Sequence, residues 1–453
     1  MPQLYRLTDT ADAQLSTVNY QLSIGDDINA LVANLAQRIF NGEKITYDPD
    51  LLHATVKPYL DGITKGYGKS LADIDWDTPD FKTLQKLTEN VFQFSASKDF
   101  NLLRDMTNAL KGSDGKLRSF DEFRQEVDRM NAKYNVNWLR TEYNQAVAAS
   151  QCAARWTDFE SRADKNPFLQ YQAVMDANTR AEHAALNGVI KRYDDDFWDK
   201  YYPPNGWGCR CEVIQLPGKN HRETPDADLK YCKVDPMFQV NVGKKGVVFP
   251  KGHPYFMGQC QRCNGAKLGL SNNYDPNNAQ CQVCLLGQKE CQEYIGDCLR
   301  QHYVQKANEN IAKIKAGMTD DGVDIFMKTM LSQNLHIYKG SFDSIMSHQG
   351  NNELLLKWLS ELDINKLNNF HYEGWAENRP YKQGQKNYDP NNPNKKKHND
   401  TQWFTYYSIN IDGETLWVHV KDRFDIGETI YTIEKKKPYD LLPGMPPKYK
   451  KKH

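Results

Sequence analysis

The chain has 453 residues, and its 58 basic side chains balance its 58 acidic ones, so the formal net charge is zero. This balance excludes a global attraction to nucleic acid or to an acidic surface, and any such preference has to be local. A chain of this length is expected to form two to four domains. Residues 1–20 lack the pattern of an export signal, and no apolar run approaches the ~20 residues of a membrane helix. We predict a protein without a membrane segment that stays in the cytoplasm.

Helical patterns dominate the first third of the chain, after a polar arm at residues 1–27. From Asp27 to Phe40, apolar residues recur at three- and four-residue steps, which is the period of an amphipathic helix. The same period predicts further helices at Phe81–Phe94, Phe100–Leu110, Phe120–Tyr134 and Val136–Arg162, with a turn at Gly112–Gly115. The last helix carries Trp138 and several alanines on its apolar face, so we expect it to pack closely against other helices.

The stretch from Tyr171 to Leu216 gathers polar residues that can form a site. Asp176, Arg180 and His183 follow one another at spacings of four and three, so a helix there would place them on nearly one face. Pro203-Pro204 then interrupts regular structure, and Cys209-Arg210-Cys211 leads into an expected strand.

Two interpretations of this polar cluster remain open. In the first, His183 joins Cys209 and Cys211 in a metal or catalytic site. In the second, the cluster is a hydrogen-bonded clasp, with Asp176 paired to Arg180 at one helical turn. We favour the clasp, because two cysteines separated by one residue are an unusual zinc spacing.

These residues carry a resemblance to a known family. The pattern Asp176-x-x-Thr179-Arg180-x-x-His183-x-x-Leu186-x-Gly188, followed by Pro203-Pro204-Asn205 and Cys209-Arg210-Cys211, resembles the signature of the phage Mu F-like head morphogenesis (minor capsid) family. The similarity extends upstream, to Phe92, Phe94, Trp138 and Glu142, and so covers about residues 28–216. It implies a virion protein of a phage or prophage that lies near the portal and acts in head assembly or DNA delivery, with portal and capsid or scaffold proteins as partners.

Four further cysteines predict a metal site. Cys260 and Cys263 form one Cys-x-x-Cys pair, and Cys281 and Cys284 form another after seventeen intervening residues. Two residues between thiolates allow one tight turn to direct both sulfurs at a tetrahedral ion. In a long chain without an export signal, metal ligands are favoured over disulfides. We therefore predict a small insert that binds structural zinc, with a redox dithiol as the alternative.

The last third changes from helices to strands. Its periodicity predicts helices at Tyr294–Met318 and Val323–Leu331, a strand at Leu335–Tyr338, a helix capped by Ser341 that contains His348, and a helix at Glu353–Leu362. Alternating residues predict strands at Trp403–Ile411, Thr415–Lys421 and Glu428–Glu434. Asp412-Gly413 is a hairpin signal between the first two, so an antiparallel meander is expected.

The order of helices followed by a meander, together with Tyr338-Lys339-Gly340, His348 and the stretch Ala376-Glu377-Asn378-Arg379-Pro380, resembles the ribonuclease superfamily of barnase, EndoU, colicin D and RelE. The resemblance implies metal-independent RNA cleavage, which needs a general base, a general acid and a cation at the phosphate. His348 or His419 is the candidate acid or base, and Lys339, Arg379 or Lys421 is the candidate phosphate ligand. An inactive virion module is the alternative.

The sequence as a whole predicts a modular α+β protein with a mainly helical N-terminal half, a small zinc-binding insert, and C-terminal helices with an antiparallel meander. The predicted parts are a polar arm (1–27), the phage Mu F-like domain (28–216), a linker with the four-cysteine insert (217–300), a helical connector (301–333), the nuclease-like domain (334–445) and a basic tail (446–453). Lysine runs at Tyr388–Asp400 and Lys435–His453 would favour phage DNA or host RNA as a local partner.

Three functions follow as hypotheses. The first is a minor head protein found in the virion, and in the host cytoplasm during assembly. The second is a ribonuclease effector that the particle delivers. The third, a zinc-ribbon protein that binds nucleic acid, explains the cysteines but not the first 216 residues.

Overall fold

We describe the fold from a computed structural model. It describes residues 27–229, 234–250, 252–256, 279–319, 323–326, 334–337, 339–348, 352–363, 370–378, 401–411, 413–423, 427–435, 437–438 and 441–443. The chain divides into two compact units, Met1–Asp297 and Cys298–His453. The helix α9 (Ala279–Gly317) contributes to both.

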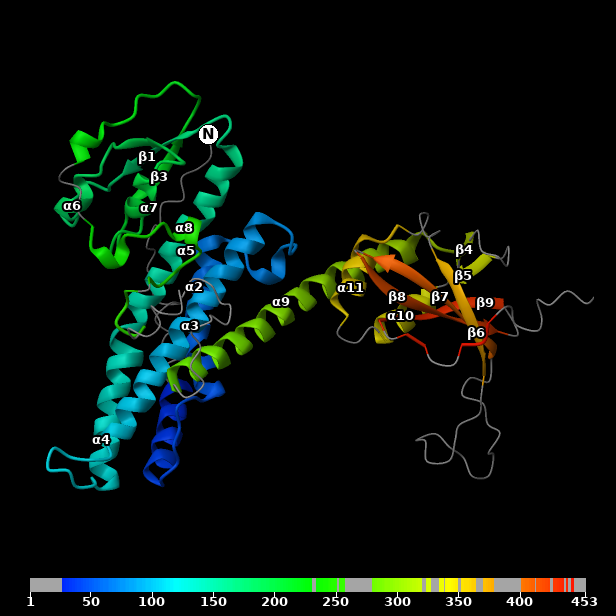
Figure 1. Ribbon diagram of the computed structural model, residues 1–453, viewed down its shortest axis with the longest axis horizontal. Coiled ribbons are helices and arrows are strands. Elements are labelled where there is room, and N and C mark those ends of the chain that lie inside the picture. The colour runs from blue at the N-terminus through cyan, green and yellow to red at the C-terminus, as the bar shows by residue number, and fades with distance from the viewer. Residues whose placement is uncertain are drawn as a thin grey trace, which may run out of the picture. The chain divides into compact units, whose positions relative to one another are not determined.

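The first unit is built on long helices that run side by side (Figure 1). They are a helix at residues 27–40, then α2 (Pro49–Tyr67), α3 (Pro79–Asn108), α4 (Phe120–Asn131) and α5 (Leu139–Arg162). Side chains cap their first turns: Asp48 accepts from the amide of Leu51, Thr78 accepts from that of Phe81, and a reciprocal pair forms between Ser119 and Glu122.

The helices differ from the prediction in two places. The two helices expected at Phe81–Phe94 and Phe100–Leu110 are one continuous helix, α3. Trp138, expected on the apolar face of α5, precedes that helix and is 51% exposed, because a π-helical turn (η2, Ala132–Asn137) shifts the register between α4 and α5.

Helices α2 and α5 approach each other closely, as the small residues of α5 predict. A Cβ atom on Gly62 would lie 2.9 Å from Cβ of Ala146, and one on Gly66 would lie 2.1 Å from the carbonyl oxygen of Val147. Both distances are too short for two atoms in contact. Glycine at these positions is therefore what allows the two backbones to pack together.

The interior of this bundle holds an ion pair. Nζ of Lys98 donates to Oε2 of Glu142 over 2.7 Å and to the hydroxyl of Tyr59 over 2.9 Å, and the side chains of the pair are 1% and 3% exposed. The Tyr59 hydroxyl also donates to Glu142 over 2.6 Å. Because these groups satisfy one another, their burial in an apolar core is tolerated.

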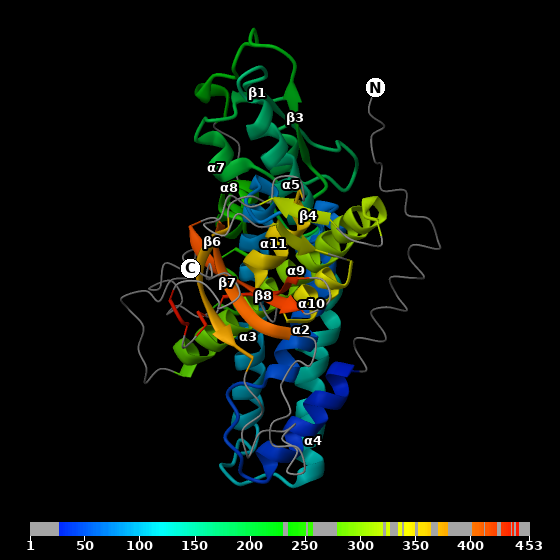
Figure 2. The same cartoon turned by 90° about the vertical axis from the view of Figure 1, so that its right-hand side faces the viewer.

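A small sheet lies at the end of the bundle opposite α4 (Figures 1 and 2). Its strands are β1 (Phe168–Gln172), β2 (Ile190–Arg192) and β3 (Glu212–Leu216), in the order β2-β1-β3 with antiparallel pairing. The strand expected after Cys211 is thus confirmed. The helix expected to carry Asp176, Arg180 and His183 is wrong over most of its length. Tyr171 lies in β1 opposite Val213, and only Ala181–Ala184 forms a helical turn, α6, which includes His183.

Short elements connect these parts. They are η1 (Leu71–Asp73), α7 (Phe197–Tyr201), η3 (Asp226–Leu229), η4 (Pro236–Phe238) and α8 (Val242–Lys245). After α8 the chain returns to the bundle, where Oδ1 of Asn90 accepts from the amides of Val248 and Phe249 at 2.8 Å each. The ring of Phe249 stacks on Phe94 at 3.7 Å between centroids, which closes the core.

The second unit contains a six-stranded sheet in the order β4-β5-β9-β8-β7-β6. The strands are β4 (Val323–Phe326), β5 (Asn334–Ile337), β6 (His371–Glu377), β7 (Thr401–Ile411), β8 (Glu414–Arg423) and β9 (Gly427–Glu434), with helices α10 (Lys339–His348) and α11 (Glu353–Glu361). The meander β7-β8-β9 is antiparallel, as predicted. The helix expected at Val323–Leu331 is wrong over its first four residues, which form a strand because they pair with β5.

The mixed class, with a helical N-terminal half and antiparallel C-terminal strands, is confirmed. Among the described helices, none is both long enough and apolar enough to cross a membrane.

Candidate metal centre beside Asp176 and Arg210

The strongest candidate site brings together His183, Cys209 and Cys211 in the first unit. His183 lies on α6 and is 3% exposed. The two cysteines immediately precede β3, whose pairing with β1 brings the segment back beside α6. The small sheet thus brings together His183 and two cysteines that lie 26 and 28 positions further along the chain.

The ligand atoms of these three residues lie within 4.8 Å of one another. Sγ of Cys209 and Sγ of Cys211 are each 3.7 Å from Nδ1 of His183. The other ring nitrogen, Nε2, lies 3.2 Å from the backbone oxygen of Asn205. The imidazole therefore has one nitrogen facing both sulfurs and the other facing a carbonyl.

Arg210 is held away from the two sulfurs. Its guanidinium donates to both carboxylate oxygens of Asp176, over 2.6 and 2.7 Å. In an extended segment alternate side chains point to opposite sides, so an outward Arg210 directs Cys209 and Cys211 inward together. This corrects the predicted pairing of Asp176 with Arg180: the partner of Asp176 is Arg210.

Arg180 holds the same segment from another direction. Its Nη2 donates to the backbone oxygen of Trp207 over 2.7 Å. A Cβ on Gly206 would lie 3.1 Å from Nη1 of Arg180 and 3.8 Å from the His183 ring, so the backbone passes close to both side chains. Asp176 and Arg180 thus position the site and are not among its candidate ligands.

Charge and hydrogen bonding perturb the acidic groups here. The Arg210 guanidinium holds the pKa of the Asp176 carboxyl well below its usual range. A hydrogen bond between the two thiols lowers the pKa of Cys209 and raises that of Cys211, which burial raises further.

This donor set is suited to binding a metal ion. Thiolate sulfur and imidazole nitrogen are the ligands that zinc and other soft or borderline cations prefer. The sequence suggested both this arrangement and a clasp without metal. The structure places the three donors together, as the first interpretation requires, and also contains the two arginine contacts that a clasp would use.

The structure describes only part of the predicted four-cysteine site. Cys260 and Cys263 lie outside the residues that the structure describes. Cys281 and Cys284 lie at the start of α9, where a spacing of three places the two positions near one face of the helix. Cys291 is buried further along the same helix.

The predicted ribonuclease residues are not assembled into a described site. Lys339 begins α10 and His348 ends it, but the side chain of His348 is not described, and Arg379 lies outside the described residues. His419 lies on β8 with its ring packed edge-on against Tyr406 at 4.8 Å. Ribonuclease activity therefore stays a prediction.

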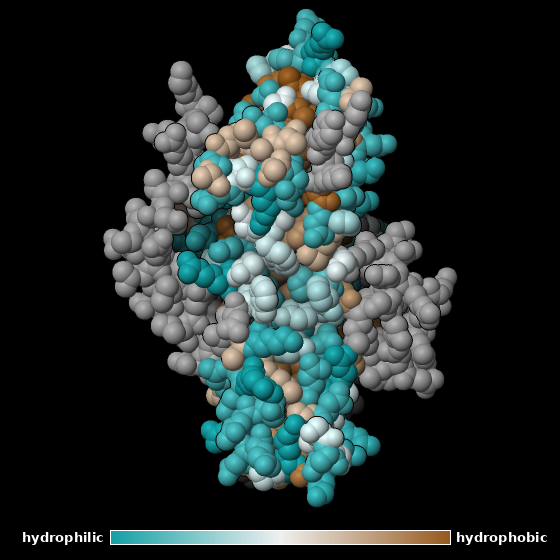
Figure 3. Space-filling view, turned by 90° about the vertical axis from the view of Figure 1, so that its left-hand side faces the viewer, coloured by the Kyte–Doolittle hydropathy of each residue, from teal (hydrophilic) through white to brown (hydrophobic). Residues whose placement is uncertain are grey.

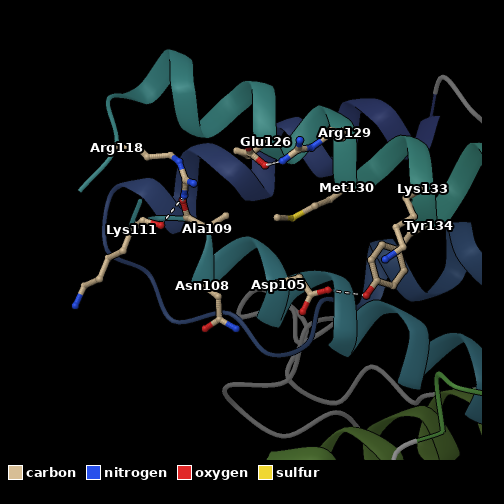
Figure 4. Close-up of a pocket in the computed structure, with 10 residues that line it drawn as sticks. All are labelled: Asp105, Asn108, Ala109, Lys111, Arg118, Glu126, Arg129, Met130, Lys133 and Tyr134. Carbon is tan, nitrogen blue, oxygen red and sulfur yellow. Dashed lines mark hydrogen bonds and ion pairs between the residues drawn. The ribbon is translucent and has the colours of Figure 1, made fainter. Parts of the chain in front are cut away.

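A separate hollow of about 540 Å³ lies between α3 and α4 (Figure 4). Arg118 donates there to the backbone oxygens of Ala109 and Lys111, and Arg129 pairs with Glu126. These two arginines bind groups of the protein itself, so they give little support for a ligand site.

Two features of the first unit were not predicted from the sequence. The first is the role of Arg210, which the alternation of side chains in an extended segment could have indicated, because a residue between two inward cysteines points outward. The partnership of Lys98 with Glu142 joins residues 44 positions apart on different helices, and no local pattern signals such a pair.

Comparisons with known proteins agree with the resemblance seen in the sequence. Residues 102–214 match the family described as phage Mu protein F like protein. A protein named for capsid assembly, protein F of Escherichia phage Mu, is 45% identical over 85 residues, or 19% of each chain. The Mu-like prophage FluMu F protein of Haemophilus influenzae is 30% identical over 181 residues, or 39% of this chain and 43% of that protein. No solved structure matches the chain.

The similarity thus spans less than half of either curated relative. It nevertheless includes the whole candidate metal centre, because the family match begins in α3 and ends in β3. His183, Cys209 and Cys211 therefore lie within the segment that is similar to phage Mu F-like proteins.

Proposed function

We propose that this protein acts in the assembly of a phage or prophage head. The observation that carries the proposal is the similarity of residues 102–214 to phage Mu F-like proteins, one of which is named for capsid assembly. On this proposal the protein works in the host cytoplasm during assembly and ends in the virion. Its partners are capsid, scaffold or portal proteins, and a position near the portal would allow it to act in DNA packaging or delivery.

An exposed apolar pair supports a contact role for the same region. Val174 and Met175, between β1 and α6, are 48% and 58% exposed. Met175 has a φ of 60°, a conformation that is uncommon for a residue other than glycine. Figure 3 shows a face that is largely hydrophilic, with hydrophobic residues gathered towards the end that carries the small sheet.

Complementation tests the proposal. The gene is deleted from the phage or prophage that encodes it, and the full chain is supplied in trans, as wild type or as Val174→Ser with Met175→Ser. We expect the deletion to abolish infectious particles, the wild type to restore them, and the variant to restore fewer while remaining folded. A matched control, Leu117→Ser, changes an apolar side chain that is 74% exposed at the other end of the unit. Normal particle yields without the gene would contradict the proposal.

A second function, ribonuclease activity of the C-terminal part, is supported by helices beside an antiparallel meander in the second unit. On this proposal the head domain carries an effector that acts on host RNA. The full chain would arrest growth and cut RNA, and His348→Ala or Lys339→Ala would relieve both. Wild-type chain that accumulates in folded form while growth and RNA stay normal would exclude this activity.

We also retain the proposal that Cys260, Cys263, Cys281 and Cys284 bind structural zinc. The helical placement of Cys281 and Cys284 supports it, because a spacing of three brings the two positions to one face of α9. Loss of one equivalent of zinc when all four are changed to serine is the expected result.

A further inference from the structure

We propose that His183, Cys209 and Cys211 bind one zinc ion, separate from the four cysteines considered above. The proposal does not depend on the assembly function, because it rests on the geometry of three side chains. It names a metal site made of a Cys-x-Cys segment and a histidine from a neighbouring helical turn.

The spacing of the donor atoms fits a tetrahedral ion. With a Zn–S distance of about 2.3 Å and a Zn–N distance of about 2.0 Å, sulfur and nitrogen in a tetrahedral site are separated by roughly 3.5 Å. Both observed Nδ1–Sγ distances are 3.7 Å. Two sulfurs at nearly this separation from one nitrogen leave room for an ion between the three atoms.

The orientation of the imidazole also fits. Nε2 of His183 lies 3.2 Å from the Asn205 carbonyl oxygen, which can only accept, so the ring proton belongs on Nε2. Nδ1 is then an unprotonated donor that points at both sulfurs. A backbone carbonyl is one of the common partners for the second nitrogen of a histidine that binds zinc.

The Cys-x-Cys segment is preorganised by contacts on its other side. Asp176 holds Arg210 outward, and Arg180 binds the backbone oxygen of Trp207. The one-residue spacing, unusual for zinc when both thiolates must come from one tight turn, is suitable here because the segment is extended and its middle residue is anchored on the opposite side. The two arginine contacts therefore hold the cysteine side chains in the orientation that a tight turn provides in a zinc knuckle.

Binding is a ligand exchange without a redox step. Each cysteine loses its thiol proton to solvent and forms a Zn–S bond, and neutral His183 adds through Nδ1, so two protons are released for each ion bound from neutral thiols. Three protein ligands leave a fourth position for water or for a donor from a partner protein. The ion would join β3 to α6 and so stabilise this end of the unit.

The test is zinc stoichiometry in the full-length protein. To separate the two proposed sites, Cys260, Cys263, Cys281 and Cys284 are all changed to serine. We expect this background protein to retain one equivalent of zinc, and to lose it when Cys209→Ser, Cys211→Ser or His183→Gln is added. The glutamine can still donate to the Asn205 carbonyl, so a clasp without metal would tolerate it. Cys298→Ala, a thiol of α9 in the second unit, is the matched control and should leave the zinc content unchanged.

Cobalt substitution provides a readout that does not require a variant at the site. In the same background protein, Co²⁺ should show the absorption of tetrahedral coordination with sulfur-to-metal charge transfer at the intensity of two thiolates. A background protein that binds neither zinc nor cobalt, or binding that persists without Cys209 and Cys211, would overturn the proposal. Either result leaves the head-assembly proposal to its own test of particle formation.

Discussion

Arg210 binds Asp176 through both carboxylate oxygens, across 34 positions of the chain. Because alternate side chains of an extended segment point to opposite sides, an outward Arg210 leaves Cys209 and Cys211 on the side of His183. The contact between Arg210 and Asp176 is solvent-exposed, so its direct contribution to global stability should be small. Its importance should instead be seen in the geometry of the His183, Cys209 and Cys211 site.

Loss of this contact should therefore weaken metal binding more than it weakens the fold. We expect Asp176→Ala to reduce zinc affinity by about tenfold, the lower end of the effect of removing groups that orient metal ligands. Competition with a chromophoric chelator measures the change. The control is Asp194→Ala, which removes another exposed aspartate–arginine pair, with Arg192. Equal zinc affinity in both variants would show that the contact between Arg210 and Asp176 does not affect metal binding.

The buried pair of Lys98 and Glu142 predicts a different response. Lys98→Met leaves a carboxylate without its cation in an apolar core and should lower the free energy of unfolding by roughly 3–5 kcal/mol. Adding Glu142→Leu removes the unpaired charge and should recover most of that loss. Urea unfolding measures the free energy of unfolding of the two variants. A double variant that is no more stable than Lys98→Met would contradict this prediction.

Asp99 predicts how stability varies with pH. Burial raises the pKa of its carboxyl to about 8, although Thr55 donates to it over 2.9 Å. Between its unfolded pKa of about 3.9 and its folded value, the unfolded chain releases this proton while the folded protein keeps it. Stability should therefore decrease as pH rises through this window, with a slope from this group of up to about 1.4 kcal/mol per pH unit.

Replacement of the carboxyl by a neutral amide tests this slope. Asp99→Asn should be less sensitive to pH than wild type between about pH 5 and 8, the window in which the folded and unfolded carboxyls differ in charge, measured by urea unfolding at several pH values. Asp77→Asn, at an exposed position, should keep the wild-type dependence. Parallel curves for wild type and Asp99→Asn would mean that Asp99 is ionised in the folded protein.

The close approach of α2 and α5 gives a packing prediction. Gly66→Ala would place a methyl group against the backbone of Val147 and should cost about 1–3 kcal/mol of unfolding free energy, as overpacking does. Gly317→Ala, in a helix with open space around the new Cβ, should have little effect. Thermal unfolding compares the two, and an unchanged transition for Gly66→Ala would contradict the close approach.

The sequence predicted most helices of the first unit because their apolar period is local information. It divided α3 in two because residues 95–99 include Ser95, Ser97, Lys98 and Asp99, which are polar and yet buried. Two of them have partners on other helices, Asp99 with Thr55 and Lys98 with Glu142. Periodicity cannot identify a buried polar residue when its partner is distant in sequence.

The residues of the candidate site were predicted from the sequence, but the partner of Asp176 was not. His183, Cys209 and Cys211 were identified as one candidate group, and the structure brings them together. The pairing of Asp176 was wrong because residues 173–180 do not form the expected helix, and the pairing of β1 with β3 brings the segment with Arg210 back beside Asp176. The strand at Val323 was missed because its four residues are too few to show a period of two, and only their pairing with β5 makes them a strand.

The most direct test of the proposed assembly function is quantitative mass spectrometry of proheads and mature particles purified from the phage or prophage that encodes this chain. We expect peptides from both units of the protein in these particles, at a fixed ratio to the major capsid protein. Particles that assemble normally and contain no trace of the chain, while it remains abundant in the lysate, would contradict a role as a head protein.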